Sequence, residues 1–154
     1  MVFEGKQDLE RRLPMRLRAW QQPGCRFVVL RDQDSGDCVE IKSQLVDKCV
    51  SAGKNDVLVR IACHELESFY LGDLQAVAQA IGPSHIVRQQ TKTKYRNPDQ
   101  LCNPFQELKR LAPAYQKVSG SRAIGQYLSL DGSNYSPSFN HLIAGIKRLI
   151  GANS

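Results

Sequence analysis

The chain has 154 residues, of which 42% are hydrophobic and 23% are charged. This length and composition are typical of one globular domain with a hydrophobic core, and they exclude an intrinsically disordered protein. The longest apolar runs have four residues, far fewer than the roughly 20 that a membrane-spanning helix needs, so we expect no membrane segment. Five cysteines at irregular spacings match neither a disulfide framework nor a zinc motif, and we therefore expect a reduced, cytoplasmic protein.

Charge is distributed unevenly between the two parts of the chain. Residues 1–83 carry 11 Lys and Arg against 12 Asp and Glu, a net charge of −1, whereas residues 84–154 carry 10 basic and 3 acidic residues, a net charge of +7. Acidic residues therefore concentrate where a cation could be held, and basic residues where a polyanion could lie. A solvated basic face is the alternative explanation for the second part.

Strands and helices alternate in the first part. The apolar residues 1–3 predict a strand; because a strand typically has about five residues, we expect further residues upstream of Met1 to complete it. The other predicted elements are a helix from Asp8 to about Trp20, a strand over 26–30, a helix over 41–50, a strand over 57–62 and a helix over 65–81. This order predicts an α/β fold with a small doubly wound, mostly parallel sheet and helices on both faces.

The second part is predicted to be a basic, mainly helical C-terminal appendage on the same domain. Residues 84–101 are polar and basic and predict a long loop. Asn103 and Pro104 are expected to open a helix by N-cap and N1 chemistry. A short helix is predicted over 120–128, and a last helix begins at Ser136. We therefore expect a single domain over 1–154, with a βαβαβα core over 1–83 and the appendage over 84–154.

Carboxylates follow each of the three predicted strands. In strand order they are Glu4; Asp32, Asp34 and Asp37; and Glu65 and Glu67. Because functional groups collect at the carboxyl ends of parallel strands, we expect these side chains to lie near one another. Carboxylates so close repel one another unless a cation or protons neutralise them, and hard oxygen ligands suit Mg²⁺ or Mn²⁺. As an alternative to binding a metal, Asp37 could cap a helix, and one of the two glutamates could lie at a helix N-terminus, where a negative charge is favourable.

Five segments carry a resemblance to a known family: VFEGKQDLE, FVVLRDQDSGDC, RIACHELESFYLGDL, YRNPDQL with NPFQEL, and AYQKVSGSRAIGQYL. Together they resemble a Toprim-like bacterial family catalogued as domain of unknown function 4276. A strand that ends in Glu4-Gly5 and another that ends in Asp32-x-Asp34 are similar to the Toprim domains of topoisomerases, primases and overcoming-lysogenization-defect nucleases. The likeness covers nearly the whole chain.

The resemblance implies a set of metal ligands. Glu4 would be a ligand or a general base, and Asp32 and Asp34 would form a magnesium-binding pair. Nuclease-type Toprim domains add an acidic residue after the third strand, which here is Glu65 or Glu67.

The resemblance also implies a basic residue near the scissile phosphate. Lys117 is the first candidate for this role and Lys94 the second. From charge and position, we expect Lys92, Lys94 and Arg96 to contact nucleic acid. The family further implies a phage-defence or toxin-like system with an ATPase partner.

Three functional hypotheses remain open. The first is a Mg²⁺- or Mn²⁺-dependent phosphodiester hydrolase, nuclease-like, that acts on nucleic acid. The second is a non-catalytic Toprim-like binding or regulatory subunit of an ATPase complex. The third, a haloacid-dehalogenase-type phosphatase with Asp32 as nucleophile and Asp34 as acid, is the weakest, because only two Asp residues follow residue 84 and they lie far apart.

Overall fold

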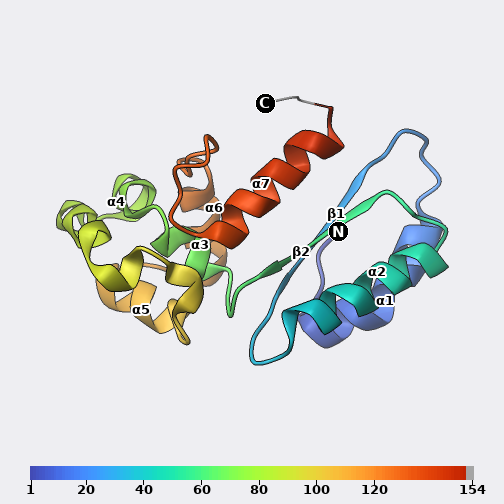
Figure 1. The fold of residues 1–154 in the computed structure, drawn as a ribbon, viewed down its shortest axis with the longest axis horizontal. Coiled ribbons are helices and arrows are strands. Elements are labelled where there is room, and N and C mark those ends of the chain that lie inside the picture. The colour runs from blue at the N-terminus through green and yellow to red at the C-terminus, as the bar shows by residue number, and fades with distance from the viewer. Residues whose placement is uncertain (152–154) are drawn as a thin grey trace.

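A two-stranded parallel sheet lies at the centre of the computed structural model, which describes residues 1–151 (Figure 1). Strand β1 (Phe27–Asp32) pairs with β2 (Val57–Ala62) in a register that sets Phe27 opposite Val57 and Asp32 opposite Ala62. Both strands are rich in β-branched residues, which pack well on a pleated surface. The parallel pairing, as predicted, brings the carboxyl ends of both strands to the same edge.

The prediction of a strand at residues 1–3 is wrong, and so is that of a three-stranded, doubly wound sheet: in the described part of the chain the sheet has two strands. Phe3 instead packs against the hydrophobic cluster beneath the sheet. The Glu4 N–H donates to the Asp8 carboxylate at 3.1 Å. This contact turns the chain directly into helix α1 (Lys6–Ala19).

Helices lie on both faces of the sheet. Helices α1 and α2 (Cys38–Ser51) lie side by side against one face, and α7 (Pro137–Leu149) runs along β2 on the other (Figure 1). The core on the α1–α2 side contains the buried residues Leu9, Leu13, Leu17, Val29, Ile41, Leu45, Cys49, Ala52 and Val59. The mixed α/β class and the C-terminal helix are therefore as predicted.

The predicted helix over 65–81 is two helices, α3 (Glu67–Leu71) and α4 (Leu74–Ile81). Asp73 separates them because its carboxylate caps α4, accepting from Ala76 N at 3.0 Å, and also accepts from Ser129 N at 3.0 Å. A cap that is anchored on both sides fixes the chain in a non-helical conformation at this residue.

The segment predicted as a long loop is packed and contains three short 3₁₀ helices, η1 (Ser84–Thr91), η2 (Thr93–Tyr95) and η3 (Pro98–Gln100). Within them Ile86 and Tyr95 are completely buried. They join a second hydrophobic cluster with α3, α4, α5 (Pro104–Leu111), α6 (Lys117–Gly125) and the start of α7. The appendage is thus mainly helical, as predicted, although residues 152–154 lie outside the described part.

None of the described helices is both long and apolar enough to cross a membrane.

Candidate acidic site at the carboxyl end of the sheet

Backbone hydrogen bonds continue the pairing of the two strands beyond their carboxyl ends. Gln33 N donates to Ala62 O at 2.9 Å, and Asp34 N donates to His64 O at 2.8 Å. Both Asp34 and His64 have positive φ angles, of 55° and 57°. Non-glycine residues adopt this conformation at a cost in free energy, which the surrounding structure has to offset. The two loops after the strands are therefore held in one fixed arrangement.

Asp32, the last residue of β1, has a pKa raised to about 6. Burial contributes most to this shift, and the negative charges of Glu67 and Asp34 add to it. A hydrogen bond from the Leu66 backbone and the positive charge of Lys117 act in the opposite direction. Three of the other side chains that the sequence singled out, Asp34, Glu67 and Lys117, therefore act on Asp32 through their charges.

Glu67 is a buried carboxylate, with an exposed fraction of 3%. The Tyr115 hydroxyl donates to its Oε1 at 2.9 Å, and burial raises the pKa of this tyrosine above its ordinary value, so that Tyr115 keeps its proton. Gly120 makes room for the ring, because a Cβ at that residue would lie 2.5 Å from the Tyr115 Cδ2. Among the described residues Glu67 has no ion-pair partner, so its charge acts on Asp32.

Two lysines interact with these carboxylates, Lys6 by an ion pair and Lys117 through its charge. Lys117 is the first residue of α6, and its ammonium lies 4.8 Å from the centroid of the Phe105 ring. Lys6, which was not among the residues predicted from the sequence, forms an ion pair of 3.0 Å with Asp34. The feature of the sequence that could have identified Lys6 is its position two residues after Glu4, a predicted ligand. A pocket of about 550 Å³ opens here, with Lys6, Asp32 and Asp34 in its lining.

The other predicted ligands have different surroundings. Asp37 caps α2, accepting from Val39 N and Glu40 N at 2.9 Å each. Glu65 accepts from Phe105 N at 2.9 Å in the first turn of α5. Glu4 is exposed just before α1, and no described hydrogen bond or ion pair of its side chain joins it to the acidic pair. Of the two glutamates left open by the sequence, Glu67 is the one whose charge raises the pKa of Asp32.

The basic residues predicted to bind nucleic acid differ in whether they form an ion pair within the protein. Lys94 forms an ion pair of 2.6 Å with Glu107, which also pairs with Arg110. Burial alone would raise the pKa of Glu107, but hydrogen bonds from Arg110, Lys94 and Tyr95 outweigh it and lower the pKa to about 2. Lys92 and Arg96 are exposed and form no ion pair within the described residues.

The fold and these side chains define an α/β protein with an acidic site at the carboxyl ends of parallel strands, where such sheets hold their functional groups. The sequence model of the family described as domain of unknown function (DUF4276) matches residues 4–147. The chain belongs to this family. The comparison with curated proteins and the comparison with solved structures each find no match.

Proposed function

We propose that the protein is a divalent-metal-dependent phosphodiester hydrolase that acts on nucleic acid, with a Toprim-like relation to known nucleases as part of the proposal. The observation that carries it is the Asp32 carboxyl. It lies at a strand end in a pocket, and burial, with the negative charges of Glu67 and Asp34 added to it, raises its pKa to about 6. A pKa raised by burial and like charges in a cleft is typical of functional sites.

The donor set fits a small, hard cation. In residues 1–151 no three His, Cys, Asp or Glu side chains lie close enough to form a complete ion site. Mg²⁺ does not require one, because it commonly keeps several waters and takes one or two carboxylates together with substrate phosphates. Asp32 and Asp34 would supply these carboxylates, and Mn²⁺ accepts the same oxygen ligands.

The chain's own side chains then have distinct tasks. Asp32 and Asp34 would hold the cation, which when bound polarises the scissile phosphate and lowers the pKa of an attacking water. Glu67, fixed by Tyr115, strengthens the negative potential at Asp32. Lys117, whose positive charge acts on Asp32, would contact the phosphate oxygens. The role of Glu4 as ligand or base stays a prediction.

The cleavage of a fluorescent oligonucleotide, as DNA and as RNA, tests the proposal. Wild type should cleave one of them with Mg²⁺ or Mn²⁺ and not with EDTA. Asp32→Asn should reduce the rate at least about 100-fold, since it removes a ligand charge while keeping the shape of the side chain. Asp47→Asn, on the exposed face of α2, is the matched control and should keep the wild-type rate. A preparation of Asp32→Asn as active as wild type would contradict the proposal. Folded wild type that cleaves neither would favour the non-catalytic subunit of an ATPase complex.

Nucleic-acid binding should depend on the exposed basic residues. The double variant Lys92→Gln, Arg96→Gln should weaken binding of a non-cleaved oligonucleotide about equally for all sequences. It should also make the dependence of log K on log salt shallower by about 1.5 to 2. Each phosphate contact that forms releases counterions, and the variant no longer forms two of these contacts. Lys94 is left unchanged because it pairs with Glu107. The control Arg18→Gln, Lys42→Gln removes the same charge from α1 and α2. Equal salt slopes for the two double variants would show that Lys92 and Arg96 do not contact the nucleic acid.

A further inference from the structure

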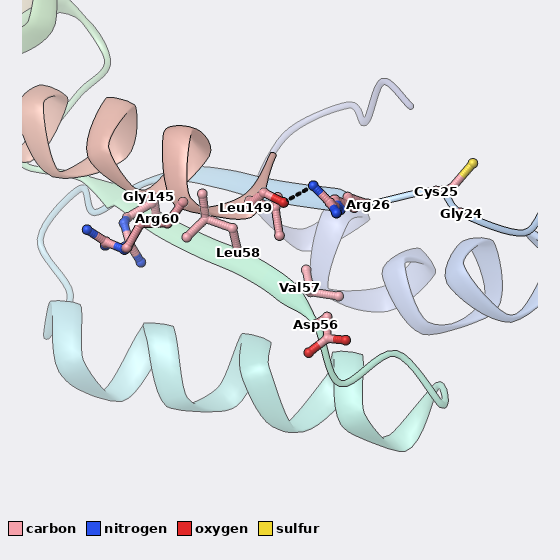
Figure 2. A pocket seen from close by; sticks show the side chains of 10 residues that line it. Gly24, Cys25, Arg26, Asp56, Val57, Leu58, Arg60, Gly145 and Leu149 are labelled. Atoms are coloured by element: carbon pink, nitrogen blue, oxygen red, sulfur yellow. Dashed lines mark hydrogen bonds between the residues drawn. The ribbon is translucent and has the colours of Figure 1, made fainter. Parts of the chain in front are cut away.

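A second groove lies between α7 and the sheet, and it shares no lining residue with the Asp32 pocket. It has a volume of about 700 Å³, within the range of small-molecule sites. Figure 2 shows Arg60 at one end and Arg26 at the other, with Leu58 and Leu149 between them. Arg148 and Asp56 complete the polar part of the lining.

The backbone holds Arg60 in this groove. Its Nη1 donates to Val59 O at 2.9 Å and its Nε donates to His141 O at 3.3 Å. Gly145 of α7 is what allows this position, because a Cβ there would lie 2.8 Å from Arg60 Nη2 and 2.9 Å from a Leu58 methyl group. The guanidinium is thus fixed by neutral carbonyl groups, which leave its charge uncompensated.

The other arginines of the groove add to this charge. Arg26 donates to the carbonyl of Leu149, and in the described part of the chain neither Arg26, Arg60 nor Arg148 forms an ion pair. Burial, and then the positive charge of Arg148, lower the pKa of Arg60. Cations gathered in one groove repel one another, and a bound anion relieves this cost.

We infer that this groove binds a nucleoside monophosphate. Arg60 and Arg148 would take the phosphate, since guanidinium groups match its oxygens with paired, charge-assisted hydrogen bonds. Leu58 and Leu149, the next side chains along the groove from Arg60, offer an apolar floor to the base. The inference does not rest on the proposed hydrolase, because its residues belong to the other pocket.

Calorimetric titration of the full chain in EDTA with AMP, adenosine and inorganic phosphate tests the inference. AMP should bind with a Kd below about 1 mM, and more tightly than adenosine or phosphate alone, because only AMP uses both parts of the groove. Arg148→Gln, an exposed change that leaves the fold intact, should weaken AMP binding at least about 10-fold through the loss of charge-assisted hydrogen bonds. Arg60→Gln should do the same, as should Gly145→Ala through displacement of Arg60.

Two controls separate this site from the acidic one. Arg122→Gln on α6 removes an equal charge outside the groove and should leave AMP binding unchanged, as should Asp32→Asn. Wild type that does not bind AMP at millimolar concentration would overturn the inference. The same holds if inorganic phosphate binds as tightly as AMP, or if Arg148→Gln binds AMP like wild type. A short oligonucleotide that binds through Arg148 where AMP does not would assign the groove to a nucleic-acid backbone instead, and would also overturn it.

Discussion

Gly72→Ala is expected to lower the free energy of unfolding by about 2–4 kcal/mol, through overpacking and the loss of buried hydrogen bonds. A Cβ at residue 72 would lie 2.7 Å from Ser136 N and closer still to the Asn134 Oδ1. Asn134 is buried, donates to Phe69 O at 3.0 Å and accepts from Ser136 N at 2.8 Å. The side chain cannot move away without breaking both hydrogen bonds.

Gly125→Ala is the matched control, because a Cβ at this end of α6 would meet no atom within 4 Å. Alanine favours a helix over glycine by about 1 kcal/mol at an interior position, so this change should be neutral or mildly stabilising. Urea denaturation of both variants measures the difference. Equal midpoints for Gly72→Ala and wild type would show that α3 and the 134–136 turn are not packed as described.

The second large effect is the pH dependence caused by Asp32 in the metal-free protein. Its folded pKa of about 6 exceeds the ordinary 3.8, so between these values the folded state binds more protons than the unfolded state. Stability contributed by this group is therefore full below about pH 4 and is lost as the pH rises through 6. Discounted for the exposed part of the side chain, the loss is about 1–2 kcal/mol.

Asp32→Asn should remove this loss, because asparagine keeps the shape and the acceptor oxygen without the charge. In EDTA the variant should be more stable than wild type by about 1–2 kcal/mol at pH 7, and the gain should disappear near pH 4. The control Asp47→Asn should not show this pH-dependent gain in the free energy of unfolding over wild type. A stability gain of Asp32→Asn that does not change with pH would show that the charge of this carboxyl is not the cause.

Local patterns in the sequence predicted much of the fold. Continuous apolar runs rich in β-branched residues predicted both strands, although Val28 and Leu30 of β1 are exposed rather than buried. Ser136 before Pro137 predicted the start of α7, where the Ser136 hydroxyl accepts from Phe139 N at 3.2 Å. Asp37 is the helix cap that the sequence left open as an alternative. Such signals depend on residues a few positions apart, and they can be read from a single sequence.

Contacts between distant residues account for what the sequence did not predict. The helix over 65–81 breaks because Asp73 has a partner 56 residues away, at Ser129. Asn103 was expected to cap α5 with its own side chain, but Glu65 accepts from the first turn of that helix, 40 residues away. The same limit applies to the candidate site, where Tyr115 rather than any neighbour in the sequence fixes Glu67.

The melting temperature with and without divalent metal tests the central claim most directly. Mg²⁺ or Mn²⁺ at millimolar concentration should raise the melting temperature of wild type by about 3 °C or more, because the ion binds the folded arrangement of Asp32 and Asp34 and not the dispersed carboxylates of the unfolded chain. The double variant Asp32→Asn, Asp34→Asn should show no such increase, while its metal-free form melts at the wild-type temperature or above. An unchanged melting temperature of wild type in both metals, or an equal increase in the double variant, would contradict the metal site and the hydrolase with it.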